Sequence, residues 1–107
     1  MKLTQTEMAV LSILVRTLKS ELGAKEVVLY GSAARGSLDM ESDIDLLVVL
    51  PAVDWEVEKR VGGLAFYAGL EIDRVISTLC FSEEDLRQSF RQKSPLLHNI
   101  RREGVML

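Results

Sequence analysis

The sequence predicts an α/β fold in which a small β-sheet is covered by helices, and three observations support this class. Stretches rich in β-branched residues alternate with stretches whose apolar residues recur at helical spacing. The 107 residues, 48% hydrophobic and 27% charged, suit a single globular domain spanning residues 1–107. The sequence shows no internal repeat and no low-complexity segment. We therefore expect one layered domain.

The first expected element is a helix that begins after Thr4. Thr4 and Glu7 form the T-x-x-E pattern of a capping box, in which each side chain bonds the backbone N–H of the other residue. Gly23 is a natural C-terminal stop for this helix. Between these two signals, apolar residues recur at helical spacing: Leu11, Leu14, Val15, Leu18 and Leu22.

Two strands are expected after this helix. Residues 26–30 (EVVLY) are β-branched and aromatic and lead directly into Gly31, which indicates a strand followed by a tight turn. Residues 36–42 form a polar, loop-like stretch. Residues 44–50 (IDLLVVL) then predict a second strand, closed by Pro51. Because both of its faces are apolar, this strand should lie inside the sheet.

Three helices and one further strand are expected in the second half of the chain. Asp54 caps a helix that two adjacent glycines weaken, and its buried face is formed by Val57, Val61, Leu64, Ala65 and Ala68. Residues 70–77 (LEIDRVIS) predict a third strand. Ser82 opens the next helix. Pro95, at the favoured first helical position, opens the last helix, which Gly104 ends.

Composition excludes several functional classes. The net charge of −3, from 13 basic and 16 acidic residues, argues against long nucleic acid as a partner, because phosphate neutralisation needs a basic excess. The single cysteine, Cys80, has no intramolecular disulfide partner, and we interpret it as a small buried residue. No secretory signal and no apolar run of membrane-spanning length is present, so we expect a cytoplasmic protein.

The turn at Gly31 and Ser32 predicts a seat for phosphate. Gly31 lets the backbone turn sharply and approach a ligand closely, because it has no Cβ. The residues after Ser32 can open a short helix whose N–H groups face an anion. Taken alone, a Gly-Ser pair is more typical of an ordinary turn between a strand and a helix.

Asp43 and Asp45 change that interpretation. Residues two apart on a strand point to the same face, about 6.5 Å apart. Two such carboxylates beside an apolar run would repel each other and lose hydration unless a cation lies between them. An isolated D-x-D pattern would only mark the exposed start of a strand. Because this pair follows a Gly-Ser turn and ten residues separate Ser32 from Asp43, we interpret it as a site for divalent cations.

A third carboxylate should come from the strand expected at residues 70–77. Asp73 lies in the middle of that segment between apolar residues, and Glu71 on the same face is the competing candidate. The alternative for Asp73 is an ion pair with Arg74 or Arg35. A carboxylate near the metal ions can accept the proton of an incoming hydroxyl. The combined pattern predicts metal-dependent phosphoryl-type transfer.

These residues resemble the signature of the polymerase β-like nucleotidyltransferase superfamily, in which Gly-Ser is followed after ten residues by Asp-x-Asp. The short chain, the run at residues 42–46 and the ending at residues 100–103 resemble the minimal nucleotidyltransferases (MNT) of bacteria and archaea. The resemblance covers nearly the whole chain and implies the nucleotidyltransferase fold, a small mixed sheet flanked by helices. It assigns the triphosphate of ATP to Gly31 and Ser32, and one or two Mg²⁺ ions and the catalysis to Asp43, Asp45 and Asp73.

The resemblance also implies a partner. Many MNT proteins are encoded beside a helical HEPN-domain toxin and act as its antitoxin, transferring AMP from ATP to a tyrosine of the toxin. Ala33 stands where other members carry a larger or basic residue, and Arg35 is available either to replace that triphosphate contact or to form an ion pair. The length of 107 residues leaves no room for a second domain that shapes an acceptor pocket, so we expect the acceptor hydroxyl on another protein or between subunits of a homo-oligomer.

Two alternatives stay open at this point. One is a catalytically inactive module that binds nucleotide or partner and neutralises a HEPN toxin by docking alone. The other is a transferase that acts on a small-molecule hydroxyl. We interpret Tyr30, Trp55 and His98 as packing or solvated residues rather than catalytic ones, and Asp39 and Glu41 as solvated loop residues.

Overall fold

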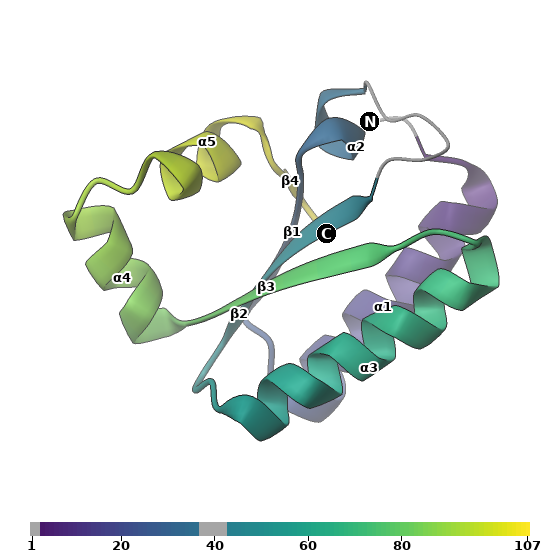
Figure 1. Ribbon diagram of the computed structural model, residues 1–107, viewed down its shortest axis with the longest axis horizontal. Helices are drawn as coiled ribbons and strands as arrows, with labels where there is room; N and C mark the ends of the chain where they lie inside the picture. The colour runs from purple at the N-terminus through teal and green to yellow at the C-terminus, as the bar shows by residue number, and fades with distance from the viewer. Residues whose placement is uncertain (1–2, 37–42) are drawn as a thin grey trace.

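The computed structural model of the chain describes residues 3–36 and 43–107, and it shows a sheet with helices on both faces (Figure 1). Within this part of the chain the sheet has four strands in the order β3-β2-β1-β4. The strand bounds are β1 Glu26–Tyr30, β2 Ile44–Leu50, β3 Ile76–Ser82 and β4 Val105–Met106. Strand β1 is antiparallel to β2 and β4, whereas β3 is parallel to β2. The expected mixed sheet flanked by helices is therefore confirmed.

Two long helices cover one face of the sheet, two shorter ones cover the other, and a four-residue helix follows β1 (Figure 1). The helix bounds are α1 Gln5–Leu22, α2 Ser32–Arg35, α3 Trp55–Ile72, α4 Glu83–Arg91 and α5 Pro95–Glu103. Helices α1 and α3 share one buried cluster with the sheet, and α4 and α5 share a second cluster on the opposite face.

Strand β2 is the centre of both clusters. The side chains that face α1 and α3 are Ile44, Leu46, Val48 and Leu50. Leu47 and Val49 face the other way and pack with Leu86 of α4 and with Leu97 and Ile100 of α5. All of these β2 side chains are at most 2% exposed. The two apolar faces seen in the sequence therefore mark an interior strand, as predicted.

Local capping signals place most helix ends where the sequence predicts them. The Thr4 hydroxyl accepts a hydrogen bond from the Glu7 N–H, and the Glu7 carboxylate accepts one from the Thr4 N–H, at 3.0 and 2.9 Å. Gly23 ends α1 in the left-handed conformation, with φ at 70°. The Asp54 carboxylate caps α3 by accepting from the Val57 N–H at 2.9 Å. These bonds satisfy N–H groups that a helix end leaves unpaired.

The strand predicted for residues 70–77 is wrong. Helix α3 continues to Ile72, and Asp73 closes it in the left-handed conformation, with φ at 53°. The helical spacing of Val61, Ala65 and Gly69, all buried, extends the helix beyond the predicted limit. Gly69 packs so closely against the backbone carbonyl of Arg74 that no Cβ fits there, which lets the chain turn back toward the sheet. The strand therefore starts later, at β3.

Strand β4 has no counterpart in the sequence-based expectation. It contains two residues, which is too short to show any periodicity. Its existence depends on pairing with β1, where Val28 lies opposite Met106 and Leu29 opposite Val105.

An ion pair joins the start of α1 to the turn after α3. Glu7 is only 7% exposed, and its carboxylate accepts hydrogen bonds from Nε of Arg74 and from the Thr4 N–H. Burial by itself raises the pKa of Glu7, but the Thr4 N–H and the Arg74 guanidinium outweigh it and hold the pKa below its usual value. Because a mostly buried pair that loses one member leaves an uncompensated charge, this contact ties α3 to α1.

Part of the expected loop lies outside the described residues, and Asp39, Glu41 and Ser42 lie there with it. Gly36, which precedes this stretch, ends α2 in the left-handed conformation.

A separate feature concerns the helices. Over residues 3–36 and 43–107, none combines the length and the apolar character that crossing a membrane requires.

Candidate active site on the sheet

Gly31 forms the corner between β1 and α2. Its backbone angles, φ 74° and ψ −150°, lie in a region that is essentially open to glycine alone. A Cβ at this position would lie 2.5 Å from Oδ2 of Asp45. Glycine is therefore required twice, once for the turn and once for the close approach of the Asp45 carboxylate. This contact brings the expected phosphate seat and the acidic pair into one site.

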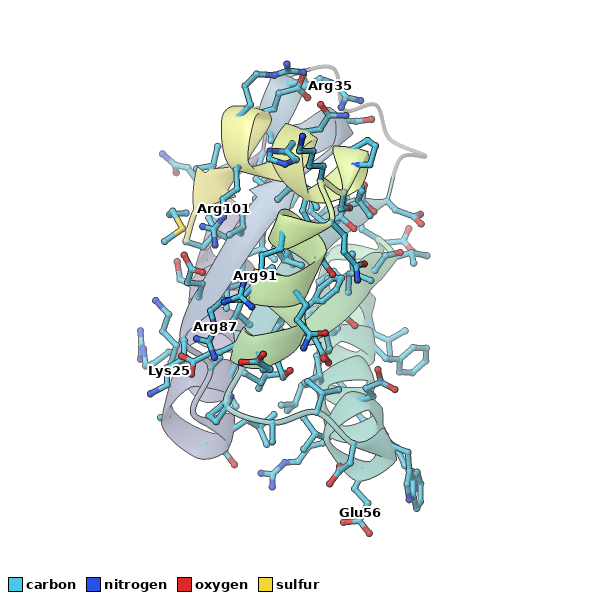
Figure 2. All side chains as sticks on the ribbon, turned by 90° about the vertical axis from the view of Figure 1, so that its left-hand side faces the viewer. Lys25, Arg35, Glu56, Arg87, Arg91 and Arg101 are labelled. Carbon is cyan, nitrogen blue, oxygen red and sulfur yellow. The ribbon has the colours of Figure 1, made fainter. Side chains whose placement is uncertain are left out.

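The residues after Gly31 divide between core and surface. Ala33 is fully buried in the cluster beneath α1 and α3, so its side chain packs and does not face a ligand. The Arg35 guanidinium lies 3.5 Å from a carboxylate oxygen of Glu103, at the end of α5. Figure 2 shows Arg35 at the end of the molecule next to α5. The ion pair expected as one of two roles for Arg35 is thus present.

Asp43 and Asp45 point to the sheet face that α4 and α5 cover. Strand side chains alternate, and the odd-numbered neighbours Leu47 and Val49 belong to the cluster on that face. Asp45 is half-buried, whereas Asp43, just before β2, is exposed. Tyr30 lies directly opposite Asp45 on β1. The pair therefore sits at the end of the sheet where β1 turns into α2.

The electrostatics of this end of the sheet favour a cation. Burial raises the pKa of Asp45, the negative charge of Asp43 raises it further, and the positive charge of Arg35 acts in the opposite direction. Burial also raises the pKa of Tyr30, and the Asp45 charge adds to that effect. A half-buried carboxylate and an exposed one that repel each other are stabilised by a bound cation, and carboxylate oxygens are ligands that Mg²⁺ prefers.

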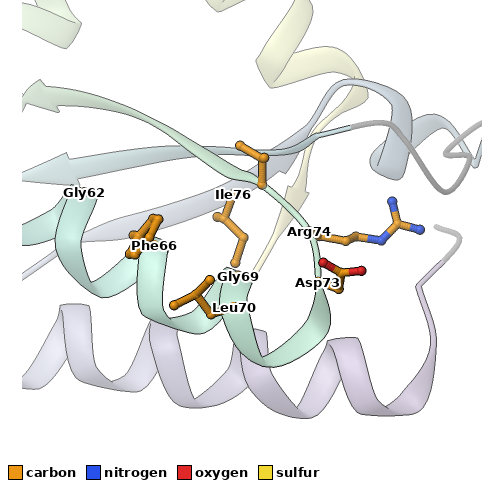
Figure 3. Close-up of a pocket in the computed structure, with 8 residues that line it drawn as sticks. Gly62, Phe66, Gly69, Leu70, Asp73, Arg74 and Ile76 are labelled. Carbon is orange, nitrogen blue, oxygen red and sulfur yellow. The ribbon is translucent and has the colours of Figure 1, made fainter.

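Asp73 does not join this pair. It is exposed at the end of α3 and borders a hollow beside Phe66 and Leu70, as Figure 3 shows. Glu71, the competing candidate, borders a groove between α1 and α3. Over the described ranges, no three His, Cys, Asp or Glu side chains are close enough together to hold a metal ion. The expectation that three carboxylates meet on neighbouring strands is therefore wrong in its geometry.

Ser77 takes the position on the neighbouring strand that the third carboxylate was expected to fill. In the parallel pairing of β2 with β3, Ser77 lies opposite Asp45. Its hydroxyl donates a hydrogen bond to Oδ2 of Asp43 at 3.1 Å. Ser77 is not among the residues predicted from the sequence, because the strand is predicted too early. The signal that could have placed the strand later is the β-branched and aromatic content of residues 76–82 (ISTLCFS), although these residues do not alternate in burial.

Comparison with known protein families identifies the domain. Residues 11–98 match the family described as nucleotidyltransferase domain. The chain belongs to this nucleotidyltransferase family. The Gly-Ser turn and the Asp-x-Asp pair of this nucleotidyltransferase domain both lie within the matched residues.

Two solved structures share the fold of the nucleotidyltransferase domain. A crystal structure of a toxin–antitoxin with AMP-PNP aligns with a TM-score of 0.65 at 19% identity, over 96% of this chain and 72% of that chain. A protein from Sulfolobus solfataricus, provisionally named a nucleotidyltransferase, aligns with a TM-score of 0.50 at 17% identity, over 99% of this chain and 89% of that one. No curated protein matches the sequence.

Proposed function

We propose that this domain transfers AMP from ATP to a hydroxyl group on a protein, with Mg²⁺ bound at Asp43 and Asp45. The observation that carries the proposal is the contact between Gly31 and Asp45. A Gly-Ser turn built only for chain reversal would not need the Asp45 carboxylate within 2.5 Å of the missing Cβ. Phosphate seat and acidic pair are adjacent, as a metal-bound triphosphate requires.

The residues of the site fit a divalent cation. Asp43 and Asp45 supply hard oxygen ligands, and their mutual repulsion is relieved when a cation binds. When bound, the ion would neutralise charge on the triphosphate and on the leaving pyrophosphate. Ser77 holds one oxygen of Asp43 and so orients that carboxylate. Gly31 leaves the backbone open to the triphosphate, and Ser32 adds a hydroxyl donor.

The proposed chemistry is a single displacement at the α-phosphorus. The acceptor oxygen forms a bond to this phosphorus while the bond to the bridging oxygen of the β-phosphate breaks, and pyrophosphate leaves with the electron pair. The proton of the acceptor hydroxyl must be removed in the same step. Asp43 and Asp45 are assigned to the cation, so the proton acceptor must be a group outside this pair. Asp73, at the end of α3, would need to be recruited from outside the pair.

For the acceptor, we propose a tyrosine of a helical HEPN-domain toxin, which makes this domain an antitoxin. Two points support this choice. The sequence resembles the MNT proteins, many of which pair with such toxins. The fold is shared with a structure described as a toxin–antitoxin with AMP-PNP, over 96% of this chain.

The test is transfer of radiolabel from α-labelled ATP to a co-purified HEPN protein in the presence of Mg²⁺. Asp43→Asn and Asp45→Asn should each abolish the label on the toxin. Glu71→Gln is the matched control, because Glu71 is an exposed carboxylate that borders a different groove. Full labelling by both aspartate variants would show that the acidic pair is not the active site.

The position of Ser77 favours a second candidate function, a module that neutralises its toxin by binding alone. A serine opposite Asp45 supplies one carboxylate fewer than the sequence predicted for the metal site. The same purified proteins separate the two functions. If Asp45→Asn protects against the toxin as well as the wild type does, docking is sufficient and transfer is not required.

A further inference from the structure

Helix α3 carries a second apolar face that nothing in the described chain covers. Its inner side chains pack with α1 and the sheet, whereas Phe66, Tyr67 and Leu70 on the outer side are 61%, 69% and 62% exposed. Val75, just after the helix, is 63% exposed. Figure 3 shows Phe66 and Leu70 projecting from successive turns on the same side of the helix. A contiguous exposed patch of large apolar residues marks an interaction site.

This outer face of α3 is hollowed, not convex. A cavity of about 370 Å³ lies between the C-terminal half of α3 and the start of β3, and it is lined largely by Gly62, Phe66, Leu70, Val75 and Ile76. Such a hollow with an aromatic rim can receive an apolar side chain from a partner.

No contact or backbone angle within the described chain requires a glycine at position 62. A Cβ at this position would meet no atom within 4 Å, and the residue is neither in a turn nor at positive φ. Glycine in a helix interior is less favourable than alanine by about 0.8–1 kcal/mol. A flat backbone here does, however, allow another helix to approach α3 closely. Gly62 lies one turn before Phe66 on the same side of the helix.

We propose that the outer face of α3 pairs with the same face of a second copy of this chain, with the two α3 helices antiparallel. Self-complementarity argues for a second copy. Because the flat position Gly62 and the projecting Phe66 are one turn apart, a two-fold axis between them places the ring of each copy against Gly62 of the other. One surface thus supplies both the projection and the space for it.

Charge complementarity points the same way. The Lys59 ammonium lies 5.5 Å from the ring centre of Trp55, at the N-terminal end of α3, and the exposed Asp73 carboxylate closes the C-terminal end. Along α3, Trp55 and Asp73 lie at equal distances on either side of the midpoint between Gly62 and Phe66. A two-fold axis at that midpoint therefore brings Trp55 of each copy next to Asp73 of the other. An antiparallel arrangement therefore places the Lys59 charge of each copy near Asp73 of the other.

The three exposed aromatic side chains supply about half of the area that a stable dimer buries on each side. An aromatic side chain buries about 150–250 Å², so the exposed fractions of Trp55, Phe66 and Tyr67 offer on the order of 400 Å². Leu70, Val75 and the polar rim add to this, and a stable interface needs roughly 800 Å² on each side. The face lies on the side of the sheet opposite Asp43 and Asp45, so pairing leaves both candidate active sites open.

Sedimentation equilibrium of the purified chain tests the proposal. We expect a dimer whose dissociation constant is on the order of 10 µM. Phe66→Asp and Gly62→Leu should each raise that constant at least about tenfold. Gly62→Leu also controls for folding, because the open space around Gly62 lets the monomer keep its melting temperature. Leu96→Asp, at a 49% exposed position on α5, is the matched control and should leave the dimer intact.

Exchanging the charges adds a test of the antiparallel arrangement. Lys59→Glu should weaken the dimer severalfold, and combining it with Asp73→Lys should restore association, because each copy supplies both partners. A wild-type chain that stays monomeric at about 500 µM would overturn the proposal. So would a dimer that survives both Phe66→Asp and Gly62→Leu. A monomer that loses toxin binding in Phe66→Asp would assign the face to the toxin instead and equally overturn self-association.

Discussion

Replacing Gly31 by alanine should disrupt the candidate site through its backbone. An L-residue at φ 74° and ψ −150° is strained by about 1–3 kcal/mol. The added Cβ would lie 2.5 Å from Oδ2 of Asp45, so the carboxylate must turn away, which adds little to the cost in stability because Oδ2 is the far end of a flexible side chain. We therefore expect Gly31→Ala to lower the free energy of unfolding by about 1–3 kcal/mol.

The same substitution at Gly63 provides the control. A Cβ there would meet no atom within 4 Å, and Gly63 lies inside α3, where alanine is favoured by about 0.8–1 kcal/mol. Gly63→Ala should therefore stabilise the domain. Because one kcal/mol shifts the melting temperature of a domain near this size by about 4–8 °C, the two variants should move it in opposite directions, by at least about 4 °C downward and a few degrees upward.

Thermal unfolding and calorimetry measure the two consequences of Gly31→Ala separately. Circular dichroism at low protein concentration reports the melting temperature. Titration with Mn²⁺ and a non-hydrolysable ATP analogue, at a temperature where the variant is folded, reports the site. We expect the affinity of Gly31→Ala to fall at least about tenfold, because displacement of Asp45 separates the acidic pair. A variant that melts within 2 °C of the wild type, by about the precision of such scans, and that binds normally would refute the contact between Gly31 and Asp45.

Three further predictions follow from the same structure. Ser77→Ala should weaken Mn²⁺ binding about fivefold in calorimetry, because Asp43 loses a hydrogen bond worth about 1 kcal/mol. Ser77→Thr keeps the hydroxyl and should bind Mn²⁺ like the wild type. Equal affinities of the wild type and both variants would contradict a positioning role for Ser77. Asp45→Asn should abolish transfer of label from ATP, while Asp73→Asn should keep most of it, and inactivity of Asp73→Asn would return Asp73 to the site. Because folding lowers the pKa of Glu7, its ion pair with Arg74 stabilises the domain above the unfolded pKa of about 4.5, and this stability is lost as the pH falls through the lower folded pKa. Chemical unfolding of Glu7→Gln should therefore show a loss of about 2–3 kcal/mol at pH 7 and a weaker dependence of stability on pH in the acid range. An unchanged pH dependence in the acid range would argue against the pair.

The helix starts could be read from the sequence because each depends on residues a few positions apart. The Thr4–Glu7 box and the Asp54 cap use hydrogen bonds that close within three residues. The interior position of β2 was also predictable, because only a strand covered on both faces can carry so many adjacent apolar residues. Arg35 was left between two roles, and only the position of Glu103 at the end of α5 showed the ion pair.

The candidate site was predicted in part for the same reason. Gly31, Asp43 and Asp45 are joined by local geometry, a turn and the two-residue period of a strand, and the structure brings them together. Asp73 was assigned by a long-range assumption about which strand lies next to β2 and where that strand begins. The strand begins several residues later than predicted, so the residue opposite Asp45 is Ser77 and the site has a hydroxyl where a carboxylate was expected.

Residue chemistry alone established the helix caps, the buried central strand and the nucleotidyltransferase signature, because each rests on interactions between near neighbours in the chain. The end of α3, the register of β3 and the short strand β4 were decided by tertiary packing. An apolar segment such as residues 70–77 can bury its side chains either as the last turn of a helix or as a strand. The close approach of Gly69 to the Arg74 backbone and the pairing of β3 with β2 divide this segment between the last turn of α3 and the start of β3, and they bring Ser77, not Asp73, beside the acidic pair.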